Sequence, residues 1–174
     1  MFILQALYYF LPAYVANMAP VIFKNPLPQP IDFHRPWHNK RIFGDNKTWG
    51  GLIAAIITGS AVFILQQSLN SIQFFQSLAI INYKQSMLFG ILMATGAILG
   101  DLAKSFIKRR LNKQPGEEWF PFDQIDYVIG ALLFTLPLYA PPLKIIIALF
   151  VLAPVLHYTV NYIAFLLGLK KVRW

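Results

Sequence analysis

No cysteine occurs in the sequence, which excludes disulfide bonds, thiolate metal sites and cysteine nucleophiles. Charge is also scarce, because only 13% of the 174 residues are charged, whereas soluble domains carry about 25%. Hydrophobic residues, in contrast, make up 57% of the chain. These proportions predict an integral membrane protein, and we expect residues 1–174 to form one domain.

The few charges are mostly positive, and the net charge is +8 at pH 7. A nucleic-acid-binding protein would gather such charge on a soluble basic face, whereas here the cations flank long apolar runs, so we reject that function. The three histidines do not predict a zinc site either, because His34 and His38 share a loop without a third ligand and His157 lies far along the chain.

Apolar runs predict an all-α fold with about five transmembrane helices, since crossing a bilayer takes about 20 apolar residues. The first run, residues 1–23, has no charge, and it is too long and lacks the basic start of a cleaved signal peptide. We expect further spans at residues 50–65, 85–100 with an extension to Arg110, 127–143 and 145–169. A short amphipathic piece should follow the second span. Small residues in the third span favour close helix packing.

Most of the acids lie in one stretch, Gly100 to Asp126, which holds five of the seven acids and five Lys or Arg residues. Charges gathered between two apolar runs are typical of an active site at a membrane surface, where aspartates bind a divalent metal and cations bind polyphosphate. A loop whose basic residues only set the topology explains the charges about equally well.

The third span, if it continues to Arg110, places Asp101, Ser105 and Lys108 on one helix face. An aspartate at the end of a membrane helix costs free energy unless it is paired or bound to a metal, so Asp101 is a functional candidate. Neutralisation by Lys104 or Lys108 is the structural alternative.

Two further aspartates, Asp123 and Asp126, share a face at the start of the fourth span. Helix capping would explain one of them, because helix N-termini favour anions by a few tenths to about one kcal/mol. Two aspartates that face Asp101 across a helix bundle favour a metal site.

A second segment with anion-binding character precedes the second span. Asp45 lies in a Gly-Asp-Asn turn, and Lys47 and Thr48 follow directly before the helix. Because a helix N-terminus attracts anions, Lys47 and Thr48 are candidates for binding phosphate. The alternative is a capping turn with Thr48 as N-cap. In the first span, Asn17 would need a partner if it faced the bundle interior.

The basic residues also predict how the chain is oriented. With five spans, the loop Lys24–Lys47, the loop Lys104–Lys113 and the tail Lys170, Lys171 and Arg173 lie on one side. They carry thirteen of the 15 Lys and Arg residues, and Lys84 and Lys144 lie on the other side. The positive-inside rule makes the first side cytoplasmic and places the N-terminus outside. Both predicted catalytic loops then face the cytoplasm, where nucleotides are found.

Five groups of motifs together resemble the CDP-archaeol synthase family, a membrane CTP-dependent cytidylyltransferase family related to phosphatidate cytidylyltransferases. The resemblance extends over nearly the whole chain. The motifs are Asn17-Met18-Ala19-Pro20, Pro30-Ile31-Asp32-Phe33, Phe43-Gly44-Asp45 with Lys47-Thr48-Trp49, Gly100-Asp101 with Lys104-Ser105-Phe106 and Lys108-Arg109-Arg110, and Phe122-Asp123-Gln124 with Asp126-Tyr127-Val128-Ile129-Gly130.

Departures from the related patterns favour the archaeol-type branch. Lys113-Gln114 stands where phosphatidate enzymes usually have Lys-Asp, and their Gly-His-Gly-Gly stretch is missing. The archaeol-type pattern often has Asp-Gly where this chain has His38-Asn39, and often has Trp-Arg-Gly where it has Trp49-Gly50-Gly51. One loop cation is therefore absent, and we expect a difference in how the lipid headgroup binds.

The resemblance implies that a membrane lipid phosphate attacks the α-phosphorus of CTP and yields a CDP-lipid and pyrophosphate. It implies Mg²⁺ as cofactor, with Asp101, Asp123 and Asp126 as ligands. The other expected site residues neutralise or bind phosphate groups. They are Lys104, Ser105, Lys108 and Arg109 for catalysis, and Asn17, Asp45, Lys47, Thr48 and Arg110 for substrate binding, with a turn as the favoured role of Asp45.

Two alternatives remain at this point. No motif distinguishes ether-linked isoprenoid chains from ester-linked acyl chains, so phosphatidate is the alternative substrate. A small transporter with Asp101 as a proton or cation site is the alternative from another class. The position of the acids at helix ends and the lack of an inverted repeat count against the transporter.

Overall fold

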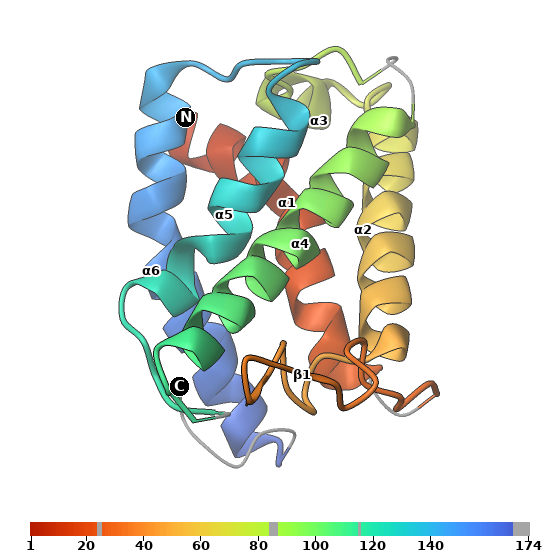
Figure 1. Cartoon of the computed structure of the whole chain (residues 1–174). Coiled ribbons are helices and arrows are strands. Elements are labelled where there is room, and N and C mark those ends of the chain that lie inside the picture. Colours follow the sequence, from red (N-terminus) through yellow and green to blue (C-terminus); the bar gives the residue numbers. More distant parts are fainter. Residues whose placement is uncertain (24–25, 84–86, 115, 169–174) are drawn as a thin grey trace.

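The structure, a computed structural model, describes residues 1–23, 26–83, 87–114 and 116–168. Long helices run back and forth between two ends of the molecule (Figure 1): α1 (Phe2–Ile22), α2 (Trp49–Leu69), α4 (Leu88–Arg110), α5 (Phe122–Thr135) and α6 (Leu143–Leu166). The all-α fold is confirmed, and α4 continues to Arg110 as the sequence predicts. Lys24, Lys84 and the basic tail lie outside the described residues.

Within the described residues, four helices are long and apolar enough to span a membrane, namely α1, α2, α4 and α6. The fourth predicted span is shorter than expected, because α5 has 14 residues and ends at Thr135 rather than at Leu143. Pro137 accounts for the early end, since a proline disfavours helical geometry in the residue before it and donates no backbone hydrogen bond.

Large apolar side chains cover the outside of the helices, as a lipid solvent requires. Ile57 on α2, Leu133 on α5 and Val151 on α6 are 62%, 63% and 64% exposed. The interior holds aromatic side chains of α1, α2 and α4, among them Tyr9 and Phe63, each 1% exposed. Apolar residues on both faces are typical of a helix bundle within a membrane.

Glycine brings α4 and α5 into close contact. A Cβ atom added to Gly130 would lie 2.1 Å from the carbonyl oxygen of Gly96, and one added to Gly100 would lie 2.3 Å from the carbonyl oxygen of Asp126. Any larger residue would force the helices apart, so small residues fix their spacing. This contact places Asp101, next to Gly100, beside the first turns of α5.

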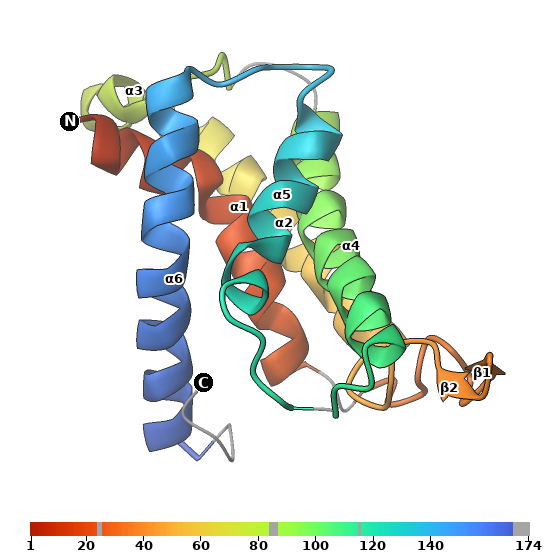
Figure 2. The same ribbon diagram turned by 60° about the vertical axis from the view of Figure 1, so that its left-hand side comes forward.

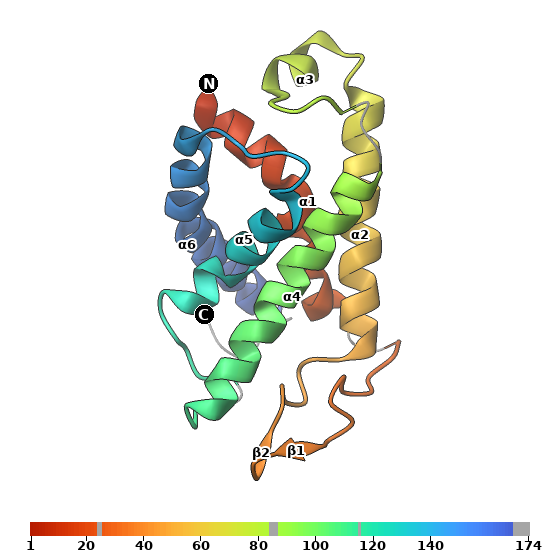
Figure 3. The ribbon, with the colours of Figure 1, turned by 45° about the horizontal axis from the view of Figure 1, so that its top comes forward.

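Two loops meet at one end of the bundle. The α1–α2 loop carries a short antiparallel hairpin, β1 (Pro36–Trp37) and β2 (Lys40–Arg41), which the sequence did not predict. Figure 2 shows the hairpin projecting from this end, and Figure 3 shows the six-residue α3 (Gln73–Leu78), the predicted amphipathic piece, at the other end. The α4–α5 connection lies at the hairpin end (Figure 1), so both predicted catalytic loops share one end of the molecule.

Candidate active site

The ammonium group of Lys104 lies at the centre of three carboxylates. Its Nζ atom is 3.1 Å from Asp101 Oδ1, 3.0 Å from Asp123 Oδ1 and 2.7 Å from Asp126 Oδ2. All four side chains are largely buried, at 5% to 14% exposed. The structure thus brings the three predicted aspartates together, and Lys104, from the face of α4 that meets α5, joins them. We call Asp101, Asp123 and Asp126 the three-aspartate cluster.

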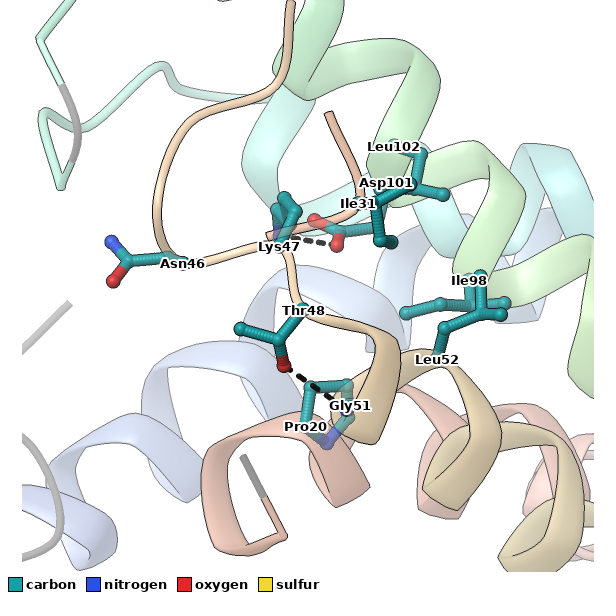
Figure 4. Close-up of a pocket in the computed structure, with 10 residues that line it drawn as sticks. All are labelled: Pro20, Ile31, Asn46, Lys47, Thr48, Gly51, Leu52, Ile98, Asp101 and Leu102. Carbon is teal, nitrogen blue, oxygen red and sulfur yellow. Dashed lines mark hydrogen bonds and ion pairs between the residues drawn. The ribbon is translucent and has the colours of Figure 1, made fainter. Parts of the chain in front are cut away.

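A second lysine reaches this cluster from the α1–α2 loop. Lys47 forms an ion pair and hydrogen bond with Asp101 Oδ2 across 54 residues of sequence. Figure 4 shows Lys47 pointing at Asp101 beside a pocket whose wall is mixed, with Thr48 and Asp101 next to apolar side chains. The apolar part of the wall consists of Pro20, Ile31, Leu52, Ile98 and Leu102.

Lys108 holds the start of α5 against the end of α4. Its Nζ atom lies 3.1 Å and 3.0 Å from the two carboxylate oxygens of Asp123 and also donates to the backbone carbonyl of Glu117. Asp123 accepts a further hydrogen bond of 2.6 Å from the backbone N–H of Trp119. Ser105 is buried on the same face of α4. The face of α4 that carries Asp101, Ser105 and Lys108, as the sequence predicts, is therefore buried in the protein interior.

Asp32 organises the loop that carries Lys47, a role that sequence reasoning missed. Its fully buried carboxylate accepts hydrogen bonds of 2.8 and 3.2 Å from the Arg41 guanidinium. The backbone N–H groups of His34, Phe43 and Gly44 donate at 3.1, 3.0 and 3.1 Å. Burial disfavours the charged form, but the Arg41 side chain and the three N–H donors outweigh it and hold the pKa of Asp32 well below its usual range. The Asx turn from Asp32 to His34 is the local signal that could have found this residue.

Arg110 joins the hairpin to the end of α4. It donates to the carbonyl oxygens of Trp37 at 2.6 Å, Lys40 at 3.1 Å and Arg41 at 2.6 Å, and its guanidinium lies over the Trp37 and Phe106 rings. Its side chain therefore holds backbone here, and the predicted role of Arg110 in substrate binding stays a prediction.

The remaining predicted site residues lie around the cluster. Thr48 caps α2, because its Oγ1 accepts a hydrogen bond of 3.1 Å from the Gly51 N–H, which confirms the capping alternative without testing a role in phosphate binding. Asp45 stands in a turn, largely exposed, and pairs with Arg41 at 2.7 Å. Asn17 is half-buried near the end of α1.

Magnesium binds oxygen ligands, preferably carboxylates, phosphates and water. The three-aspartate cluster supplies such donors at one point, so the donor chemistry fits this ion. With Lys104 Nζ at that point, no set of three acidic or histidine side chains in the described parts of the chain is spaced to hold a metal.

The apolar helices define the class of this protein as membrane-embedded, and comparison with solved structures shows that it resembles an enzyme. A structure of an intramembrane enzyme for archaeal membrane lipid biosynthesis superposes with a TM-score of 0.77 at 30% identity, covering 91% of this chain and 94% of the other.

Sequence comparison gives the particular family. A family model described as CarS-like, CDP-archaeol synthase, matches residues 1–174. The CDP-archaeol synthase of Pyrococcus furiosus is 39% identical over 173 residues, covering 99% of this chain and 98% of the relative. That of Methanococcus maripaludis is also 39% identical, covering 98% and 96%. The chain belongs to the CDP-archaeol synthase family. It is an enzyme of the nucleotidyltransferase type, which excludes the transporter alternative.

Proposed function

We propose that this enzyme transfers CMP from CTP to the phosphate of a membrane lipid of the digeranylgeranylglyceryl phosphate type, with Mg²⁺ as cofactor. The products are a CDP-lipid and pyrophosphate. The names of the relatives support the reaction, and the three-aspartate cluster is the observation in this chain that carries it. The cluster lies beside a pocket of about 10 Å³ with an apolar wall, which would have to widen to admit part of a lipid.

The chemistry requires charge neutralisation and in-line positioning rather than a strong general base, because the attacking group is already an anionic phosphate oxygen. That oxygen forms a bond to the α-phosphorus of CTP, while the bond from this phosphorus to the oxygen that bridges to the β-phosphate breaks. Mg²⁺, held by Asp101, Asp123 and Asp126, would neutralise charge on the triphosphate. Lys104 and Lys108 would stabilise the developing negative charge.

Lys47 is the residue best placed to hold the lipid phosphate. Its ammonium lies at the polar side of a pocket whose other wall includes Ile31, Leu52 and Ile98. A lipid that entered sideways between the helices would keep its chains on the apolar wall and bring its phosphate to Lys47. Such a contact would replace part of the pairing between Lys47 and Asp101.

We also propose that the hairpin end faces the cytoplasm and that the N-terminus lies outside. The α1–α2 loop lies at this end together with the last two turns of α4 and the connection that follows them (Figure 1), and these segments contain nine of the ten Lys and Arg residues of the described chain. The positive-inside rule then orients the enzyme with the cluster toward the nucleotide pool.

The test is the release of pyrophosphate from CTP by purified protein in lipid, with digeranylgeranylglyceryl phosphate and phosphatidate offered separately. We expect turnover with the first substrate and its loss when EDTA removes Mg²⁺. Turnover with phosphatidate alone would move the substrate to the ester lipids. Folded protein without turnover on either lipid would overturn the proposed reaction.

A further inference from the structure

A second pocket lies between the β1–β2 hairpin and the end of α4, and its volume is about 290 Å³. Four cations line it, Lys40, Arg41, Arg109 and Lys113, together with one carboxylate, Asp45. The other lining residues are polar or glycine, so the wall has no apolar side chain. An excess of cations around a concave surface creates a positive potential that attracts anions. We call this site the basic pocket.

Lys40 and Arg109 are the two cations of this pocket that form no ion pair among the described residues, and the Lys40 ammonium donates to the Arg110 carbonyl at 2.9 Å. The Nε atom of Arg109 is buried without a hydrogen-bond partner, and one terminal nitrogen donates to the Gln114 carbonyl at 3.2 Å. Lys113, in contrast, pairs with Glu117 at 2.6 Å. The Arg109 side chain is half-buried, and a buried N–H group without an acceptor is unfavourable unless an anion satisfies it; phosphate oxygens match guanidinium geometry.

The basic pocket lies next to the three-aspartate cluster but farther along α4. Arg109 directly follows Lys108, which pairs with Asp123 of the cluster. At a rise of 1.5 Å per residue, Asp101 and Arg109 are separated by about 12 Å along the helix axis. An anion that extends from the cluster toward the end of α4 would therefore reach the basic pocket.

We propose that the basic pocket binds a polyphosphate anion, namely the β- and γ-phosphates of the nucleotide before the reaction and pyrophosphate after it. The identity of the nucleotide rests on the proposed function. When the bond between the α-phosphorus and its bridging oxygen breaks, the electron pair leaves on that oxygen, and the resulting anion stays in contact with Lys40, Arg109 and Lys113. The lipid phosphate shares this chemistry, but a wall without apolar side chains offers no place for lipid chains.

The proposal is tested by direct binding of pyrophosphate to the purified full-length protein, measured by calorimetry without CTP or lipid. The informative variant is Lys40→Gln combined with Lys113→Gln, and Lys144→Gln, an exposed lysine at the other end of the molecule, is the matched control. We expect the dissociation constant of pyrophosphate to rise at least about 10-fold in the double variant, because two charge-assisted contacts with the anion are lost. The control should bind as the wild type does.

Turnover assays show whether the basic pocket binds the phosphates of CTP or the phosphate of the lipid. In the double variant, KM for CTP should rise while KM for the lipid phosphate stays unchanged. Unchanged pyrophosphate binding in the double variant, or a rise confined to KM for the lipid, would overturn the proposal. Should the double variant not fold, Arg109→Gln alone gives the same test. Wild-type protein that binds pyrophosphate through these residues but forms no CDP-lipid would overturn the proposed function and leave the anion site in place.

Discussion

Lys104 on α4 and Asp126 on α5 form an ion pair of 2.7 Å. The ion pair lies where Gly100 and Gly130 allow the backbones of the two helices to come into contact. The same ammonium contacts Asp101 and Asp123, so one lysine balances charge from both helices. Lys47 and Lys108 each pair with one of the other two aspartates. Asp126 therefore depends on Lys104 alone among the ion pairs of the described residues.

We predict that Lys104→Gln destabilises the protein in the absence of divalent metal. Asp126 would then be a buried carboxylate without a cation, and loss of one partner of a buried pair costs about 3–5 kcal/mol. Thermal unfolding in detergent measures the effect as a lower Tm. Because Mg²⁺ would find three carboxylates without the competing ammonium, its addition should raise Tm more in the variant than in the wild type. An equal or smaller rise in the variant would show that the cluster is not the metal site.

Gly130→Ala should separate α4 from α5 and lower both stability and activity. The added methyl group would meet the Gly96 carbonyl oxygen at 2.1 Å, and overpacking of this kind costs about 1–3 kcal/mol or more. Activity should fall further than stability explains, since Asp101 and Asp126 would move apart. Leu133→Ala, at a 63% exposed position on the outside of α5, is the control and should have little effect. Wild-type Tm and turnover in Gly130→Ala would contradict the packing described here.

Asp32→Asn should loosen the loop that presents Lys47 while leaving the helices intact. The variant loses the charge that holds Arg41 and weakens the hydrogen bonds from the Phe43 and Gly44 N–H groups. Hydrogen exchange of these two amides, followed by mass spectrometry at pH 7, should become at least about 10-fold faster. Unchanged protection would show that Asp32 does not stabilise the loop.

The Asp32 carboxylate also determines how the α1–α2 loop of the wild type responds to pH. The pKa of Asp32 is lowered on folding, so its stabilising contribution is fully present above the unfolded-state value of about 4 and is lost only as pH falls through the lower folded-state value. Protection of the Phe43 and Gly44 amides, corrected for intrinsic exchange, should therefore be constant from pH 8 to pH 5. A loss of protection within that range would contradict the assignment.

Much of this arrangement could be predicted from the sequence because membrane helices follow from long apolar runs and the acids are few. The three aspartates were identified by their places at helix ends, and the fold brings them together. The predicted length of α5 is wrong, because the prediction ends the span near Pro141 and Pro142 although Pro137 already disfavours the helix.

The loop was the least predictable part. Arg110 binds the backbone of Trp37 and Arg41 about 70 residues away in sequence, and no local pattern shows such contacts. The two-residue strands of the hairpin are too short for a periodic signal. The alternative that Lys104 neutralises Asp101 is confirmed, whereas its further contacts with Asp123 and Asp126 depend on the glycine contact of α4 and α5, which no local pattern shows.

The measurement that tests the proposed chemistry most directly is CDP-lipid formation by Asp126→Asn across a range of Mg²⁺ concentrations. Glu118→Gln is the control, because Glu118 lies in the same connection but accepts a hydrogen bond from the Tyr158 hydroxyl. We predict that Asp126→Asn lowers kcat/KM at least about 100-fold and requires more Mg²⁺, whereas Glu118→Gln keeps most of the activity. Full Mg²⁺-dependent activity in folded Asp126→Asn would contradict a catalytic role for the three-aspartate cluster.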